Sequence, residues 1–186
     1  MLVDLSLPPE KPRREDAGRR EAELFRLGHY GTHLDRLLGS TIPLEYFESR
    51  ALLFDISGFS RERPVHSRDV ALDTVREGDF ILFHTGALLR NTYARKEYMT
   101  EFIEFSWEVI NALLQRKIRF IGLDARGLRE GEEHREADTL CEESGVYVIE
   151  NIVNTEQLPP GEPFTLYTTW FDTRGTGLPC RLVARV

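Results

Sequence analysis

Short apolar runs that stop at turn residues dominate the hydrophobic pattern of the chain and predict buried strands. Residues 51–56 and 79–84 are the clearest examples, because each run is almost entirely apolar and ends at Ser-Gly or Thr-Gly. Residues 2–7 alternate only weakly and end at two prolines, which is typical of an edge strand. The pattern predicts further strands at 118–123, 146–149, 164–170 and 182–186.

A second periodicity predicts two helices. Between residues 100 and 116 apolar side chains recur every three or four positions, which is the spacing of a broad-faced amphipathic helix. Residues 132–144 form the other helix, and Gly145 is suited to end it. Its common face consists of Ala137, Leu140, Cys141 and Ser144. The remaining segments are predicted as loop or helix at 10–22, extended or irregular backbone at 26–34, and one helical turn at 43–47.

The order of these elements indicates the fold class. Two strand-helix-strand units, at 100–123 and 134–149, predict parallel strands, and the other strands lack intervening helices. We therefore expect an α/β protein, a mixed sandwich of sheet and helix. A length of 186 residues suits a single domain over 1–186 with a core of its own.

Composition and charge exclude several classes of protein. A net charge of -7 disfavours binding to a nucleic-acid backbone, and no apolar run approaches the length that spans a membrane. The N-terminus reaches proline and charged residues before a signal-peptide core could form. Cys141 and Cys180 are far apart and form no Cys-x-x-Cys pattern, so neither a disulfide framework nor a cysteine-based zinc site is expected. A cytoplasmic location fits these features.

The segment His29-Tyr30-Gly31-Thr32-His33-Leu34-Asp35 carries the residues best suited to chemistry. In a helix Asp35 would lie about 240° round from His29, too far to share one site. In extended backbone both histidines and Asp35 point to one side, but a straight strand at about 3.3 Å per residue would separate the histidines by roughly 13 Å. We therefore predict a bend at Gly31, because glycine tolerates a bulge or an unusual φ.

Two imidazoles and a carboxylate that face one side suit zinc, manganese or iron. The alternative is structural: His29 and His33 would be half-buried polar residues bonded to the backbone, and Asp35 would cap a following helix. Two histidines and an aspartate around one glycine favour the metal site over this alternative.

The pattern His-x-Gly-Thr-His-x-Asp resembles the signature of the cyclase family, which includes kynurenine formamidases and isatin hydrolases. Two further segments are similar to that family: the run Gly145 to Asn151, in which a strand ends in Glu-Asn, and Gly122-Leu123-Asp124, which resembles the family's Gly-Val-Asp. The resemblance extends over most of the chain from His29. It implies a cyclase-like swivelling β/β/α domain with a mixed sheet, assembled as a homodimer or homotetramer.

The resemblance also implies a ligand set. His29, His33, Asp35 and Glu150 would converge on one or two divalent ions, zinc or manganese, and Asp35 would bridge if two were bound. The chain departs from the family at two positions that usually carry a second-site histidine, which are Gly39 and Asp138 here. Asp138 can still bind a hard cation through oxygen, and His134 lies one helical turn earlier. His134 is equally compatible with a solvent-facing role, and His84, a further candidate, is better explained as a satisfied core or loop residue.

The activity that the resemblance implies is that of a metal-dependent C–N hydrolase similar to arylformamidase. An ion-activated water would cleave a small amide, formamide, lactam or lactone; Glu150 would complete the metal shell or accept the water's proton, and Asp138 or His134 would protonate the leaving group. Two alternatives stay open. The chain could be a non-catalytic member of the fold that binds a metal or a small molecule, or an isomerase or dehydratase that stabilises an enolate.

Overall fold

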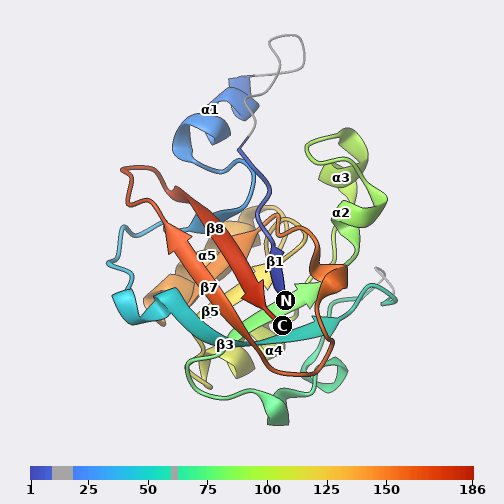
Figure 1. Ribbon diagram of the computed structural model, residues 1–186. Helices are drawn as coiled ribbons and strands as arrows, with labels where there is room; N and C mark the ends of the chain where they lie inside the picture. Colours follow the sequence, from blue (N-terminus) through green and yellow to red (C-terminus); the bar gives the residue numbers. More distant parts are fainter. Residues whose placement is uncertain (10–18, 60–62) are drawn as a thin grey trace.

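The strands form one mixed sheet that closes on itself. The computed structural model describes residues 1–9, 19–59 and 63–186. Its strands are β1 (Leu2–Asp4), β2 (His33–Asp35), β3 (Glu48–Asp55), β4 (Phe80–His84), β5 (Phe120–Leu123), β6 (Tyr147–Glu150), β7 (Phe164–Trp170) and β8 (Gly177–Arg185). They are arranged in the order β1-β8-β2-β6-β5-β4-β3-β7, and an additional pairing of β7 with β8 closes seven of them into a barrel (Figure 1).

Strand β8 makes this closure possible because it pairs along both of its edges. Residues 180–185 pair with β7 on one edge, while residues 177–179 and 183–185 pair with β2 and β1 on the other. Neighbouring strands from β3 to β6 are parallel, whereas the pairings of β1, β2, β7 and β8 are antiparallel. The predicted α/β class is thus confirmed, but its sheet is a closed barrel rather than a sandwich layer.

The helices lie outside the barrel. They are α1 (Arg19–Leu27), α2 (Ala87–Arg90), α3 (Lys96–Thr100), α4 (Trp107–Leu114) and α5 (Glu132–Glu143), with 3₁₀ turns at Leu44–Phe47, Ser67–Asp69, Leu72–Thr74 and Thr155–Gln157. Helices α4 and α5 are the crossovers between parallel strands, as predicted. Helix α1 and the α2–α3 pair extend from the upper part of the molecule in Figure 1. Within the described residues, no helix is long and apolar enough to cross a membrane.

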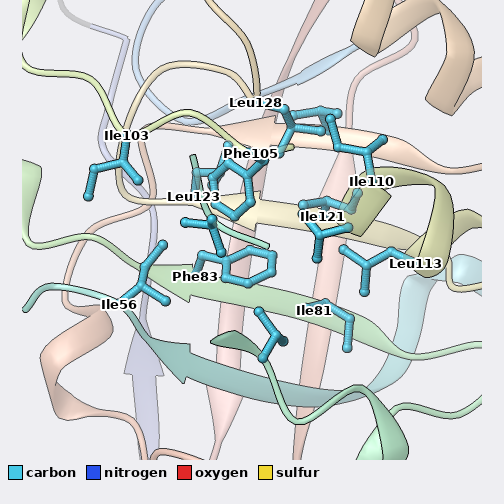
Figure 2. Close-up of a cluster of buried hydrophobic side chains, with 14 of the residues drawn as sticks. Ile56, Ile81, Phe83, Ile103, Phe105, Ile110, Leu113, Ile121, Leu123 and Leu128 are labelled. Carbon is cyan, nitrogen blue, oxygen red and sulfur yellow. The ribbon is translucent and has the colours of Figure 1, made fainter. Parts of the chain in front are cut away.

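Two hydrophobic clusters explain why the strand sequences are apolar at successive positions. Ile81, Phe83 and Ile121 pack with α4 residues such as Ile110 and Leu113 in the cluster between sheet and helices (Figure 2). Alternate residues of the same strands face a second cluster, to which all eight strands contribute and which therefore fills the barrel. Its members on the central strands are Phe80, Leu82, Phe120, Tyr147 and Ile149. Strands buried on both faces lose the alternation of polar and apolar residues.

Most predicted elements are present, and the differences have local causes. The helix predicted at 100–116 begins only at Trp107, because the Ser106 side chain accepts a hydrogen bond from the Val109 amide and caps it there. The segment predicted as extended or irregular backbone at 26–34 is helical up to Leu27. The last strand begins at Gly177, earlier than predicted. Of the predicted segment 10–22, residues 10–18 lie outside the described residues and the remainder belongs to α1.

Candidate metal centre

The predicted bend at Gly31 is present and returns His29 toward the strand that carries His33 and Asp35. Gly31 has a φ of +66°, and a β-carbon there would lie 2.4 Å from the Leu7 carbonyl oxygen, so only glycine fits. The rings of His29 and His33 are 5.0 Å apart between centroids. The bend thus replaces the long separation of a straight strand with direct contact.

A close approach of two glycines fixes the other end of this segment. A β-carbon on Gly28 would lie 1.9 Å from the carbonyl oxygen of Gly177, so the two backbones meet without room for a side chain. The neighbouring residues are joined as well, since His29 Nε2 lies 2.8 Å from Thr176 Oγ1. The start of β8 therefore positions His29.

His29, His33 and Asp35 form one compact group. His29 Nδ1 is 2.9 Å and His33 Nε2 is 3.5 Å from Asp35 Oδ1. One ligand atom from each residue lies within 4.8 Å of the others, the proximity needed to hold a single metal ion. Pairing of β2 with β6 places Glu150 opposite His33, and Glu150 Oε2 lies 3.6 Å from His33 Nε2.

A second group shares Asp35 with the first and draws on helix α5. His134 and Asp138 are one helical turn apart, with His134 Nε2 3.2 Å from Asp138 Oδ2. Asp35, His134 and Asp138 also bring ligand atoms within 4.8 Å of one another, and Glu150 Oε1 lies 3.6 Å from His134 Nε2. Gly127 leaves room for this arrangement, because a β-carbon there would lie 2.3 Å from the His134 ring.

The histidines have their remote ring nitrogens engaged by oxygen atoms. His33 Nδ1 lies 3.0 Å from the carbonyl oxygen of Gly31, and His134 Nδ1 lies 3.1 Å from that of Arg129. A carbonyl oxygen can only accept, so each of these nitrogens carries the proton. The Nε2 lone pairs of His33 and His134 therefore face the carboxylates when the rings are neutral, which is the arrangement that metal-binding histidines adopt.

The strongest evidence that these residues fit a cation is the set of buried polar atoms without hydrogen-bond partners. Buried polar groups are nearly always satisfied, so a concentration of exceptions in one place requires an explanation. In the described chain, five such atoms meet here: His33 Nε2, both oxygens of Asp35, Asp138 Oδ1 and Glu150 Oε1. Asp35 Oδ1 is near His29 Nδ1 yet lacks hydrogen-bond geometry toward it. A divalent cation would satisfy these atoms together.

Burial and mutual charge shift the pKa values of the first group. Burial alone would lower the pKa of His33, but the nearby negative charges of Asp35 and Glu150 outweigh it and raise the pKa to about 9. Burial alone would raise the pKa of Asp35, yet the two histidines hold it below its ordinary value. In the protein as described, a proton on His33 balances the charge of Asp35.

The surroundings of Asp138 and Glu150 disfavour the charged forms of these two carboxyl groups. Burial, followed by the charges of Asp35 and Glu150, raises the pKa of Asp138 well above its ordinary value. Burial and the charge of Asp35 also raise the pKa of Glu150, against the opposing effect of the histidines. Three buried carboxyl groups this close repel one another, and either protons or a cation must compensate them.

The sequence-predicted candidates thus fall into two sets. The structure brings together His29, His33, Asp35, His134, Asp138 and Glu150. His84 lies elsewhere, with Nδ1 2.8 Å from Thr155 Oγ1 and 3.2 Å from Asp124 Oδ2, in agreement with a satisfied buried histidine. Gly39 contributes no side chain, and its loop is held by Glu142, which accepts hydrogen bonds from the amides of Leu38 and Ser40.

Three residues around the cluster were not predicted. Thr176 and Gly127 contact histidines that are distant in sequence, so no local signal could have identified them. In the sequence, Asn151 stands out only as part of the Glu-Asn ending of a strand. Its side-chain amide reaches both Gly31 and His33.

A closed α/β barrel with a cluster of carboxylates and imidazoles at the start of β2 defines a protein with a potential divalent-cation centre. Residues 3–128 match the family model described as "Putative cyclase". The chain therefore belongs to the cyclase family. A comparison with curated proteins finds no significant match.

Solved structures agree with this fold. A "potential metal-dependent hydrolase with cyclase activity" is 22% identical with a TM-score of 0.75, covering 99% of this chain and 96% of its own. Isatin hydrolase A from Labrenzia aggregata, bound to benzyl benzoate, is 20% identical with a TM-score of 0.75, and the match covers 99% of this chain and 93% of the hydrolase chain. An isatin hydrolase bound to the product analogue thioisatinate is 18% identical with a TM-score of 0.76, and the match covers 100% of this chain and 92% of the hydrolase chain. The likeness is one of fold over nearly the whole chain.

Proposed function

We propose that the protein is a metal-dependent hydrolase that cleaves a C–N bond in a small amide, formamide or lactam, or the ester bond of a lactone. The convergence of unpaired buried imidazole and carboxyl atoms from β2, β6 and α5 carries this proposal. His29, His33 and Asp35 would hold one zinc or manganese ion. Asp138, Glu150 and His134 would hold a second ion together with Asp35, or act on the substrate if one ion is bound.

Each group has a role that follows from its surroundings. A bound divalent cation would lower the pKa of a water and polarise the substrate carbonyl. Glu150, close to both His33 and His134, is placed to accept a proton from the attacking water. Asp138 and His134 lie 3.2 Å apart beside Glu150, and either would protonate the leaving nitrogen or oxygen. His134 is 38% exposed and links the buried carboxyl groups to solvent.

The similar structures support the substrate class. Two of them are isatin hydrolases, one with a product analogue bound, and isatin is a cyclic amide. We extend this class to the present chain as a small-molecule substrate with a hydrolysable carbonyl. The proposal includes a single swivelling β/β/α domain over 1–186 and assembly as a homodimer or homotetramer in the cytoplasm.

Metal analysis combined with a substrate panel tests the proposal. The protein should retain zinc or manganese after purification, lose it to a chelator, and hydrolyse at least one member of a panel of aryl formamides, lactams and lactones. His33→Ala should reduce turnover by more than about 100-fold, beyond the loss typical of residues that only orient a ligand. His66→Ala is the matched control, since His66 pairs with Glu108 and not with the cluster. Unchanged turnover in His33→Ala would reject the assignment.

One observation favours a second candidate, a non-catalytic metal- or small-molecule-binding protein. Gly39 and Asp138 occupy positions where the family commonly has histidine, so the second group differs from the family pattern. Bound metal without turnover of any panel member would support this candidate.

A further inference from the structure

Two consecutive residues contact opposite sides of one histidine ring. Glu150 Oε2 lies 3.6 Å from His33 Nε2, whereas the side-chain nitrogen of Asn151 lies 3.4 Å from His33 Nδ1. Neighbouring residues of a regular strand point to opposite faces of the sheet. Asn151 departs from this rule because its φ is +59°, in the left-handed region. The strand therefore ends so that both side chains reach the same ring.

The amide of Asn151 has one orientation that satisfies its neighbours. Its nitrogen donates to the carbonyl oxygen of Gly31 at 3.0 Å, and its oxygen accepts a hydrogen bond from the Tyr98 hydroxyl. A flipped amide would direct its oxygen at the Gly31 carbonyl, which cannot donate. The same Gly31 carbonyl accepts from His33 Nδ1. Asn151 and the His33 ring thus share one acceptor, and Tyr98 holds the Asn151 amide in place.

Tyr98 is suited to this task because it is itself immobilised. Its side chain is 1% exposed and comes from α3, and its ring lies 5.5 Å from that of Tyr93. The Tyr93 hydroxyl accepts a hydrogen bond from the Gly31 amide at 2.8 Å. The segment that carries α2 and α3 therefore reaches both peptide groups of the bend, one through Tyr93 and the other through Tyr98 and Asn151.

We propose that Asn151 and Tyr98 are positioning residues for His33. They hold the Gly31 carbonyl oxygen in the position where it accepts a hydrogen bond from His33 Nδ1–H. This hydrogen bond orients the ring so that Nε2 faces Asp35 and Glu150. The proposal deepens the proposed function and rests on it as far as His33 is a metal ligand. The geometric part, that Asn151 and Tyr98 hold the His33–Gly31 hydrogen bond, applies with or without a metal ion.

Three variants isolate this arrangement. Tyr98→Phe removes only the hydroxyl that holds the Asn151 amide. Asn151→Gly removes the amide, and because glycine accepts a positive φ it keeps the backbone conformation. Tyr147→Phe is the control, since it also removes a buried tyrosine hydroxyl, one that contacts Ser40 and Thr41 instead. Chemical denaturation of the metal-free proteins shows whether each variant folds, and Asn151→Gly decides the test if Tyr98→Phe does not.

The first measurement is the affinity for Mn²⁺ and Zn²⁺ by competition with a fluorescent chelator. Tyr98→Phe and Asn151→Gly should bind each ion roughly 10- to 100-fold more weakly than the unaltered protein, the range found when partners of a ligating histidine are removed. Tyr147→Phe should differ by less than about twofold, because it leaves the His33 partners intact. Affinities of both test variants equal to that of the unaltered protein would overturn the proposal.

The second measurement needs no metal. In metal-free protein labelled with ¹⁵N-histidine, the His33 Nδ1 proton should exchange slowly with water, with His33→Gln used to assign its signal. Tyr98→Phe and Asn151→Gly should accelerate this exchange by about tenfold or more, corresponding to a loss of roughly 1.4 kcal/mol of protection. If the unaltered protein binds no ion, the proposed function fails, yet the exchange rates still decide the positioning proposal: accelerated exchange upholds it and unchanged exchange refutes it.

Discussion

His33 is the residue at which the charges and hydrogen bonds of the cluster meet. It is 1% exposed. Its Nε2 lies near the carboxyl groups of Asp35 and Glu150, and its Nδ1 contacts the Gly31 carbonyl oxygen. Its part in the cluster could be predicted because glycine, histidines and aspartate are close in sequence. The inward position of His134 could not, since a histidine in a charged run is equally compatible with solvent. The roles of Thr176 and Asn151 depend on contacts between distant strands.

The raised pKa of His33 predicts how the stability of the metal-free protein depends on pH. In the folded state the pKa is about 9 against an ordinary 6.5, so between these values the folded form binds more protons than the unfolded form. The stability that protonated His33 contributes to the folded state is fully present below pH 6.5 and is lost as the pH rises to about 9. The raised pKa values of Asp138 and Glu150 act in the same direction. Asp35, with a lowered pKa, contributes stability that is lost only at acid pH.

We therefore expect the free energy of unfolding, measured by urea titration in the presence of chelator, to fall between pH 6.5 and 9. His33→Gln should flatten this dependence, because glutamine does not titrate. If the free energy of unfolding fell equally steeply with pH in the unaltered protein and in His33→Gln, the titration of His33 would not be the cause of the pH dependence.

At the scale of elements, strands were predicted well because apolar runs such as 79–84 are buried on both faces. The start of helix α4 at Trp107 was not predicted. Ile103 and Phe105 do belong to the cluster beneath α4, but they reach it from irregular backbone, with Phe105 bridged to Val65. Apolar spacing therefore indicated burial correctly without indicating backbone conformation.

The Ser106 cap tests this boundary. Ser106→Ala removes the acceptor for the Val109 amide and should lower the free energy of unfolding by about 1 kcal/mol. Thr100→Ala, at the exposed end of α3, provides the comparison and should change it by less than about 0.5 kcal/mol. Thermal and urea unfolding would measure both, and a smaller loss in Ser106→Ala than in Thr100→Ala would contradict the capping role.

At the scale of the whole molecule, closure of the barrel could not be predicted from sequence. It depends on β8 pairing with β2, near the beginning of the chain, along one edge and with β7, near its end, along the other, and no local pattern specifies such partners. The same topology assembles the cluster, because its ligand atoms come from the bend before β2, from β2 and β6, and from α5, the helix between β5 and β6. A bound ion would therefore connect segments more than a hundred residues apart.

Metal binding should stabilise the fold as a whole. An ion that binds only the folded protein raises the free energy of unfolding by about 2.7 kcal/mol at a free concentration of about 100 times its Kd. Urea unfolding at increasing Mn²⁺ or Zn²⁺ should show this logarithmic rise, and His33→Ala should abolish most of it. A midpoint independent of ion concentration in the unaltered protein would contradict a metal centre at this position.

The contact between Gly28 and Gly177 sets a limit on how this scaffold can be redesigned. The two backbones touch where the bend carrying His29 meets the start of β8, so neither position has space for even a methyl group. Libraries that diversify the loops around the cluster to accept new ligands should leave this pair untouched, together with Tyr93 and Tyr98, and place their variation at exposed positions of the α2–α3 segment such as Leu89.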